Sequence, residues 1–241
     1  MGNFEVIIYQ KRDGVGYVIL NRPQALNAYS LQMRDELYEV LGAIRDDPEV
    51  KVAIFQGAGE EAFCAGADLT EFLTAPSPVI ARQARWERDI WGLFLGISKP
   101  LIAALHGYVL GSGIEIALCC DIGLASEDAQ FGLPEVGLGI IPAAGGSQTL
   151  PRTIGRSRAL EILLTGRWIE ADEAHHLKLV NRVVSRADLL PEAEKLANRI
   201  KAYSPLALSY AKQAVIRGLD LGLGEGLELE ARLGNRLLAS K

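Results

Sequence analysis

The chain has 241 residues, of which 49% are hydrophobic and 23% are charged, as in an ordinary globular protein. A chain of this length can bury a large core as one domain, or as one domain with an appendage, without disulfides or a structural metal. The formal net charge of −5 argues against nucleic acid or an anionic membrane as a partner, because both favour a basic surface. A small anionic ligand remains compatible with this charge, since a helix N-terminus can bind a phosphate.

The three cysteines, Cys64, Cys119 and Cys120, do not indicate a disulfide framework, because their number is odd and two of them are adjacent. No Cys/His spacing resembles a zinc site, so we expect buried free thiols and no metal. The first ten residues lack the basic and apolar regions of a signal peptide, and no apolar run reaches the roughly 18 residues of a membrane span. We therefore expect a cytoplasmic protein with no membrane partner.

The first part of the chain predicts three strands and a helix. Two β-rich runs, Phe4–Tyr9 and Val15–Leu20, are separated by Lys-Arg-Asp-Gly and indicate a hairpin. Ser30 can cap a helix that ends near Pro48 and whose apolar positions recur at helical spacing. A short apolar strand, Val50–Gln56, follows it.

The middle of the chain continues the alternation of strands and helices. A unit of strand, strand and helix recurs about three times before residue 184, which favours an α/β fold class. The predicted elements are, in order, a helix over about 79–97, a strand over 101–105, a helix over 114–120, short extended pieces over 121–125 and 130–131, then helices and a last strand near 179–184.

The character of the chain changes after Arg186. Three helical patterns, over 189–202, 205–217 and 225–238, follow one another with no strand between them. We therefore predict a mixed core over residues 1–185 and a helical region over residues 186–241, which either packs on the core or joins subunits.

Two segments carry glutamates in unusual surroundings. In Gly111-Ser-Gly-Ile-Glu115 small residues precede an apolar helix, so backbone N–H groups can reach a ligand and the helix end favours a developing negative oxygen. Glu135 lies between Pro134 and Val136 in a stretch poor in charge, where a carboxylate tends to be paired or kept for function. Plainer alternatives are that Glu115 complements the helix dipole and that Glu135 points to solvent.

A third segment, Phe63-Cys-Ala-Gly-Ala-Asp-Leu69, has small residues that let a ligand approach the main chain. An ordinary strand-to-helix loop with Asp68 as a cap explains it equally well. Together, however, two carboxylates and two small-residue loops are the parts needed for proton transfer beside a thioester carbonyl. The N–H groups stabilise an enolate oxygen and the carboxylates move protons or position water.

These segments and three others resemble the enoyl-CoA hydratase/isomerase (crotonase) family, in register from residue 4 to about 184 and with a fitting helical tail. The resemblance implies an α/β fold, a crotonase-like spiral of repeated ββα units with a C-terminal helical trimerisation region, and a homotrimer or a hexamer made of two trimers. The matching motifs are Asn21-Arg-Pro-Gln-Ala-Leu-Asn-Ala28, Ala65-Gly-Ala-Asp-Leu69, His106-Gly-Tyr108, Gly111-Ser-Gly-Ile-Glu115, Leu133-Pro-Glu135 and Ile141-Pro-Ala-Ala-Gly-Gly146.

The resemblance also assigns roles within the site. It makes Glu115 and Glu135 the catalytic acids and bases, and the backbone N–H groups of Ala65 and Ser112 the oxyanion hole. The N–H of Ala143 would help to hold the water. No separate cofactor is implied, because coenzyme A is part of the substrate. The residues that would bind the coenzyme A part are Ala25, Ala65, Gly66, Ala67, Asp68, Leu69 and Gly111.

Because hydratases of the family keep both glutamates, the resemblance favours hydration of a 2-enoyl-CoA to the 3-hydroxyacyl-CoA, as in fatty acid β-oxidation. Two alternatives stay open: double-bond isomerisation or another acyl-CoA reaction of the family, and an RNA- or protein-binding role. The chain departs from the family at Ser112 and Ala143, where glycine is usual. It also ends sooner than the resemblance implies, so we expect that a last helix helping to cover the site is missing.

Several aromatic residues and histidines allow more than one interpretation. Trp86, Trp91 and Phe94 either line an acyl pocket or pack in the core. His106 is expected to be structural. His175 and His176 are adjacent in the chain, so their side chains point in different directions and predict no metal site.

Overall fold

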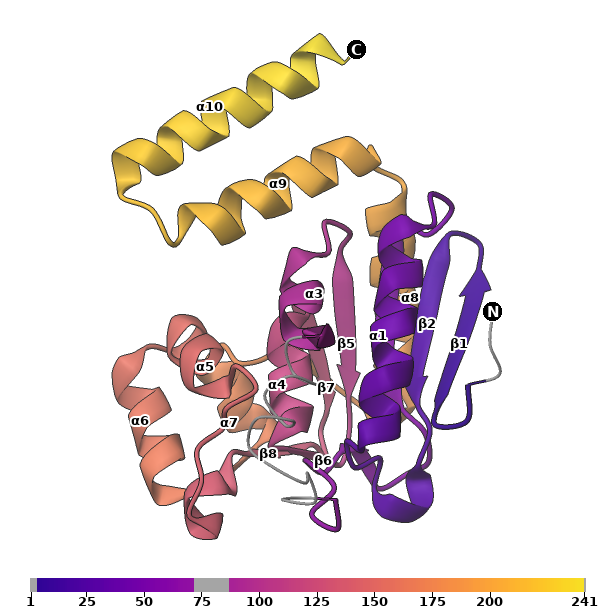
Figure 1. Ribbon diagram of the computed structural model, residues 1–241, viewed down its shortest axis with the longest axis vertical. Coiled ribbons are helices and arrows are strands. Elements are labelled where there is room, and N and C mark those ends of the chain that lie inside the picture. Colours follow the sequence, from indigo (N-terminus) through magenta and orange to yellow (C-terminus); the bar gives the residue numbers. More distant parts are fainter. Residues whose placement is uncertain (1–3, 72–86, 241) are drawn as a thin grey trace.

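The computed structural model describes residues 4–71 and 87–240. Figure 1 shows strands flanked by helices on both sides, and a pair of C-terminal helices set apart from this core. None of the helices in the two described ranges has the length and apolar character that crossing a membrane would need.

The larger sheet contains the predicted hairpin and the first strand of each later repeat. Its strands are β1 (Ile7–Arg12), β2 (Val15–Leu20), β3 (Val52–Gly57), β5 (Leu101–Leu105), β7 (Ile122–Ser126) and β10 (Arg182–Val184). They lie in the order β1-β2-β3-β5-β7-β10. β1 and β2 are antiparallel, which confirms the hairpin, and each later strand is parallel to its neighbours in this sheet.

The smaller sheet takes up the second strand of each repeat. Its strands are β4 (Ala62–Cys64), β6 (Tyr108–Leu110), β8 (Gln130–Gly132) and β9 (Trp168–Glu170), in the order β4-β6-β8-β9. Each has only three residues, too few to show an alternating pattern. For that reason the sequence did not predict β4, β6 or β9.

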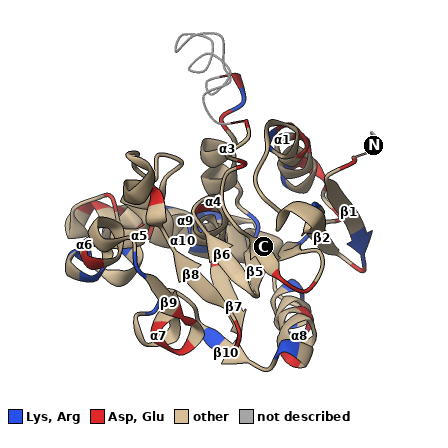
Figure 2. Cartoon of the chain, turned by 90° about the horizontal axis from the view of Figure 1, so that it is seen from below, with Lys and Arg blue, Asp and Glu red and all other residues tan. Residues whose placement is uncertain are grey.

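The repeats explain why the motifs meet. β3, β5 and β7 each pass from the larger sheet to β4, β6 and β8 of the smaller one. Because β2, β3, β5 and β7 are parallel, the segments that follow them gather at one edge, where the carboxyl ends of the strands lie. Figure 2 views the molecule from this end, with β6 and β8 near the centre and α1, α3 and α4 on one side.

Helix α1 (Leu31–Asp46) covers one face of the larger sheet and confirms the helix predicted after Ser30. The Ser30 hydroxyl accepts a hydrogen bond from the N–H of Met33 at 3.1 Å, so it caps the helix as predicted. Its buried side chains recur at helical spacing and pack on the strands: Met33, Leu37, Val40, Leu41 and Ile44.

Helix α8 (Leu189–Lys201) covers the opposite face of the same sheet. Its Leu189, Ala193 and Ala197 are buried against strand residues such as Tyr17 and Ile102. The first helix after residue 186 is therefore part of the core by its packing. The strands lie between α1 and α8. Because these helices cover the two faces of the sheet, the edge at the carboxyl ends of the strands, where the motifs gather, stays open.

The remaining helices connect the sheets or carry the motifs. The predicted helix over about 79–97 falls partly on residues 72–86, outside the described residues, and its described end is α3. The bounds are α3 (Ile90–Gly96), α4 (Ser112–Cys119), α5 (Gly146–Ile154), α6 (Arg156–Thr165), α7 (Ala171–His176) and the 3₁₀ turns η1 (Pro23–Ala25), η2 (Pro134–Leu138) and η3 (Arg186–Asp188).

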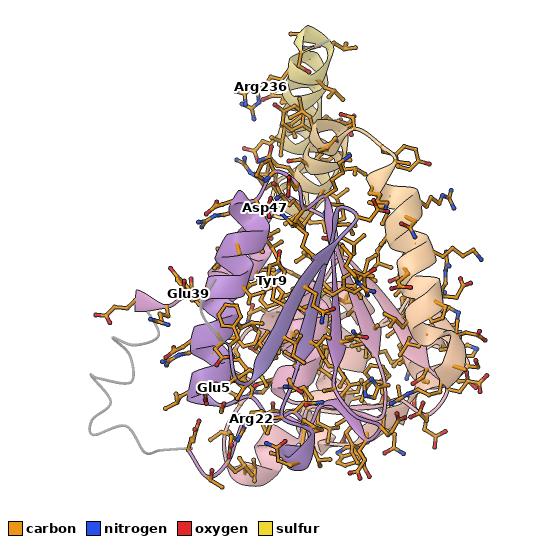
Figure 3. All side chains as sticks on the ribbon, turned by 90° about the vertical axis from the view of Figure 1, so that its right-hand side faces the viewer. Glu5, Tyr9, Arg22, Glu39, Asp47 and Arg236 are labelled. Carbon is orange, nitrogen blue, oxygen red and sulfur yellow. The ribbon has the colours of Figure 1, made fainter. Side chains whose placement is uncertain are left out.

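The last two predicted helices, α9 (Pro205–Gly218) and α10 (Leu223–Ala239), pack on each other at the far end of the molecule. In Figure 3, Arg236 of α10 lies at the opposite end from Arg22, which follows β2. Lys212 ties α9 to the core, because its Nζ donates to Asp121 Oδ2 at 2.8 Å and to the carbonyl of Lys99 at 3.0 Å. The C-terminal pair therefore leaves the edge with the motifs uncovered.

Candidate active site

A cavity of about 860 Å³ lies at this edge, and it brings together five of the site residues that the resemblance implies. Ala67, Ser112, Glu115, Glu135 and Ala143 all line it. Much of the remaining wall is apolar. A volume of this size, with a few polar groups on an apolar wall, is typical of a small-molecule site.

Glu115 is buried in the first turn of α4, with 3% of its surface exposed. Its Oε1 accepts hydrogen bonds from the N–H groups of Ala144 and Gly146, each at 2.9 Å. Such bonds favour the charged form of a carboxyl group. A Cβ on Gly146 would lie 3.1 Å from the same oxygen, so the loop comes this close because glycine stands there. The sequence pointed to this loop through Ala143, but not to the two N–H groups that hold the carboxylate.

Glu135 reaches the cavity from η2. Its Oε2 is buried and has no hydrogen-bond partner among the described residues. Burial raises the pKa of Glu135 above its ordinary value, and the negative charge of Glu115 adds to the rise. The two carboxyl groups therefore lie in different surroundings: Glu115 accepts N–H donors, and burial favours the protonated form of Glu135.

The raised pKa of Glu135 predicts a pH-dependent stability. The folded chain binds this proton more tightly than the unfolded chain does. Glu135 therefore adds stability below its unfolded pKa of 4.5, and the gain is lost as pH rises through the folded pKa. We expect Glu135→Gln to unfold at a higher temperature than wild type near pH 7, and the difference to vanish near pH 4. Thermal unfolding at both pH values tests this prediction. A difference in unfolding temperature between variant and wild type that is equal at both pH values would contradict it.

The structure contradicts the assignment of Ala65 to the oxyanion hole. The N–H of Ala65 donates to the carbonyl of Leu26 at 3.0 Å, so it is engaged within the fold. Ala67 lies two residues later and lines the cavity, and no hydrogen bond of the described residues uses its N–H. Ala67 therefore replaces Ala65 as the candidate donor. Ser112 keeps its place, because as the first residue of α4 its N–H has no acceptor within the helix.

Two glycines bring these donors to the same wall. Gly66 has φ +108° and Gly111 has φ +49°, a backbone conformation that favours glycine. A Cβ on Gly111 would lie 3.3 Å from Gly66 Cα and 3.1 Å from Glu135 Oε1. The residues that follow the glycines, Ala67 and Ser112, therefore lie side by side next to Glu135.

The predicted coenzyme A segments run along each other beside the cavity. The N–H of Tyr29 donates to Gly66 O at 2.8 Å, and the N–H of Asp68 donates to Tyr29 O at 2.9 Å. Arg22 holds the Asp68 carboxylate at 2.9 Å, so this side chain stabilises the loop. Ala25 lies in η1 at the start of the same segment, and Leu69 is exposed.

Asn27 was missed by the sequence analysis and fixes this loop from inside. It is fully buried, and its Nδ2 donates to the carbonyls of Ala58 and Ala62 at 2.8 and 2.7 Å. It also has φ +55°, which asparagine tolerates better than most residues. Its place within the Asn21–Ala28 motif was the available signal.

The aromatic residues that could line a pocket or pack in the core occupy different places in the structure. Trp91 lines the cavity and its ring lies 5.9 Å from that of Tyr29, whereas Phe94 is buried against Phe55 in the core. Trp86 lies outside the described residues. His106 is buried away from the cavity, and burial lowers its pKa to about 4.

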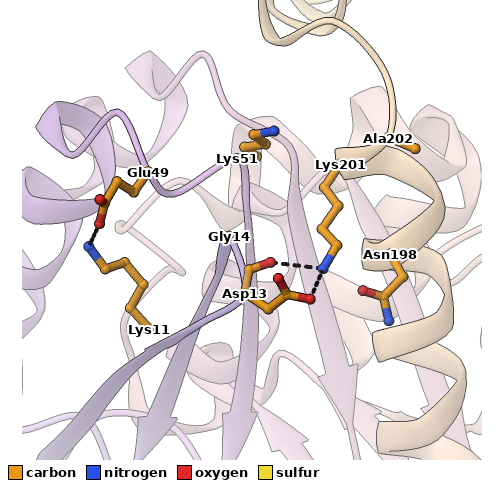
Figure 4. Close-up of a pocket in the computed structure, with 8 residues that line it drawn as sticks. All are labelled: Lys11, Asp13, Gly14, Glu49, Lys51, Asn198, Lys201 and Ala202. Atoms are coloured by element: carbon orange, nitrogen blue, oxygen red, sulfur yellow. Dashed lines mark hydrogen bonds and ion pairs between the residues drawn. The ribbon is translucent and has the colours of Figure 1, made fainter.

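A second hollow, of about 550 Å³, lies at the amino-terminal ends of β2 and β3 (Figure 4). It contains none of the motif residues. Lys201 Nζ donates to Asp13 Oδ2 at 2.7 Å, and Lys11 pairs with Glu49. Since two of its lysines are already paired with acids, and ligands of such sheets bind at the carboxyl ends of the strands, the cavity with the two glutamates is the candidate site.

Known proteins are similar to this chain over nearly all of its length. Residues 10–241 match the family model described as enoyl-CoA hydratase/isomerase. The chain belongs to this family. Membership in the enoyl-CoA hydratase/isomerase family confirms the predicted crotonase-like α/β fold with its C-terminal helices, and it confirms that the chain is an enzyme of this group.

Individual relatives of the family are similar over almost their whole length. A crotonyl-CoA hydratase of Syntrophomonas wolfei is 39% identical over 95% of this chain and 88% of its own. A short-chain-enoyl-CoA hydratase of Clostridium acetobutylicum is 40% identical over 93% of this chain and 86% of its own. Among solved structures, an enoyl-CoA hydratase from Bacillus anthracis is 38% identical with a TM-score of 0.93, over 98% of this chain and 92% of that one.

Proposed function

We propose that the chain is a lyase that hydrates a 2-enoyl-CoA thioester to the 3-hydroxyacyl-CoA, reversibly. The observation that carries the proposal is that Glu115 and Glu135 line one cavity together with Ala67 and Ser112. The printed names of the relatives, crotonyl-CoA hydratase and short-chain-enoyl-CoA hydratase, support the same reaction. Two acids suit hydration, because water must lose a proton while the α-carbon gains one.

In the proposed mechanism the water oxygen bonds to the β-carbon while Glu115 takes a proton from it. Hydrogen bonds from Ala144 and Gly146 orient Glu115 for this role and favour its charged form. The π electrons move toward the thioester oxygen, where the N–H groups of Ala67 and Ser112 stabilise the negative charge. Glu135, whose pKa is raised by burial, then delivers a proton to the α-carbon.

The remaining features of the reaction follow from the substrate. Coenzyme A is part of the substrate, so no separate cofactor is proposed. Ala25 and the loop Ala65–Leu69 would bind its adenine and pantetheine parts, with Gly111 beside the thioester and the N–H of Ala143 holding the attacking water. The proposal places the enzyme in the cytoplasm, in fatty acid β-oxidation.

We propose further that the enzyme works as a homotrimer or as a hexamer made of two trimers. Large apolar side chains on the C-terminal helices are exposed in the single chain, which supports an assembly role for these helices. They are Leu206, Val215, Ile216, Leu219, Leu223, Leu227 and Leu238.

The proposed reaction can be tested with crotonyl-CoA. Hydration removes the conjugated double bond, so we expect the enoyl absorbance to fall and 3-hydroxybutyryl-CoA to appear. The assay should be repeated with 2-enoyl-CoA substrates of increasing chain length. Conversion of 3-enoyl-CoA to 2-enoyl-CoA, with no hydration at any length, would contradict the proposal and favour an isomerase instead.

A further inference from the structure

The wall of the active-site cavity carries two arginines in addition to the glutamates. Arg34 comes from the first turns of α1, and Arg88 lies just before α3. Both line the same cavity as Glu115 and Glu135. The proposed hydration uses neither of them, so they need another explanation.

The two guanidinium groups share a single carboxylate oxygen. Arg34 approaches Asp35 Oδ1 with Nη2 at 2.8 Å and Nε at 2.9 Å, and Arg88 Nη1 approaches the same oxygen at 3.4 Å. Among the residues that the structure describes, two positive charges therefore face this one carboxylate. A guanidinium has five N–H donors in a planar fork, so the pairing with Asp35 does not use all the donors of the two arginines.

Other partly buried arginines of the chain have more complete pairing. Arg22 has the Asp68 carboxylate at 2.9 Å and also donates to the carbonyl of Ala28 at 2.7 Å. Arg167 lies between Glu161 and Glu173, at 3.2 and 2.6 Å. Arg34 is as shielded as these two, with 22% of its side chain exposed against 18% and 30%. Among the described residues, the acid that pairs with Arg34 is Asp35 of its own helix, which Arg88 shares.

Aromatic side chains line the same cavity as the arginines and the catalytic acids. The Tyr29 ring packs against Trp91 at 5.9 Å. Burial has the largest effect on the pKa of Tyr29 and raises it. The positive charge of Arg34 lowers this pKa, and the negative charge of Glu115 raises it. Tyr29 therefore lies within electrostatic reach of both groups. The cavity therefore holds acidic, aromatic and basic side chains.

We propose that the substrate carries a carboxylate at the end of its acyl chain, and that Arg34 and Arg88 bind it. The proposal rests on the hydratase function and narrows its substrate class to enoyl-CoA esters of dicarboxylic acids. An apolar tail would remove water from two cations without replacing its hydrogen bonds, which is costly. A carboxylate would instead accept the planar donors of one or both arginines.

The test compares two substrates of equal length, 2-hexenoyl-CoA and 2-hexenedioyl-CoA, which differ by a terminal methyl or carboxylate. We expect the wild-type kcat/KM to be higher for the diacid. In Arg34→Gln, Arg88→Gln and the double variant, the ratio of kcat/KM for diacid to monoacid should fall by about ten- to hundredfold, the usual effect of hydrogen bonds to a charged group. The 2-octenoyl and 2-octenedioyl pair repeats the comparison at a second length.

Two matched variants sharpen the result. Asp35→Asn removes the acid that competes for both arginines, so the ratio should rise. Arg45→Gln removes an exposed arginine of the same helix that pairs with Asp46 and lines no part of the cavity, so the ratio should stay at the wild-type value. The Arg45 variant also controls for general effects of removing a positive charge from α1.

Three outcomes would overturn the proposal, and they are distinguishable. An equal loss of kcat/KM for both substrates would indicate that the arginines bind a phosphate of coenzyme A, because both substrates carry it. An unchanged ratio in the double variant would remove them from substrate binding altogether. Failure of the wild type to hydrate either substrate would reject the hydratase function itself, and this inference with it.

Discussion

Replacing Glu135 by glutamine should lower kcat for hydration by about 10²–10⁴-fold, the range that positioned acid–base groups contribute. Glutamine keeps the size of the side chain but cannot deliver a proton to the α-carbon. Because Glu135 Oε2 has no hydrogen-bond partner among the described residues, replacing this atom breaks none of their hydrogen bonds. Glu115→Gln should have an effect of similar size. Steady-state kinetics with crotonyl-CoA measures both losses.

A matched acid far from the cavity provides the control. Glu230 is exposed on α10, so Glu230→Gln should leave kcat unchanged. Binding of the product to the Glu135→Gln variant should also persist, which would show that its site is intact. A Glu135→Gln variant with at least a fifth of wild-type kcat would remove this residue from the proton transfer.

Replacing Gly113 by alanine should damage both the fold and the reaction. Its Cβ would lie 2.2 Å from the carbonyl oxygen of Cys64 at the end of β4, so α4 and β4 must separate. Overpacking of this kind costs about 1–3 kcal/mol of unfolding free energy. The same shift displaces Ser112 from Ala67. We therefore expect kcat to fall by about 10²–10³-fold, the effect of losing one oxyanion donor.

The control for this substitution is Gly42→Ala. A Cβ on Gly42, within α1, meets no atom within 4 Å, and alanine favours a helix by up to about 1 kcal/mol. The melting temperature of this variant should therefore stay the same or rise, and its activity should not change. Wild-type kcat in Gly113→Ala would show that the close contact of β4 with α4 is not required for the reaction.

Long, regular elements could be predicted from the sequence because the signals were local. The hairpin needed two β-rich runs around a turn, and α1 needed only Ser30 and a row of apolar positions. The three-residue strands of the smaller sheet could not be predicted in this way. They exist because each repeat crosses from one sheet to the other, and pairing with a neighbouring strand stabilises so short a piece.

The site residues likewise include some that local signals predicted and some that they did not. Glu115 and Glu135 stood out because charge in an apolar stretch is unusual, and the structure brings them to one cavity. The prediction that Ala65 donates to the oxyanion was wrong. Which N–H of a loop of small residues is available depends on which of them already donate a hydrogen bond within the fold. Here Leu26 O takes that of Ala65. Arg34 could not have been singled out, because it looks like any charged residue on the surface of a helix.

A crystal structure with bound 3-hydroxybutyryl-CoA would test the central claim most directly. The hydroxyl oxygen should lie within about 2.6–3.2 Å of Glu115, with the Glu135 carboxyl group facing the α-carbon. The thioester oxygen should lie about 2.7–3.1 Å from the N–H groups of Ala67 and Ser112. A thioester bound outside this cavity, or one whose hydroxyl contacts neither glutamate, would contradict the claim.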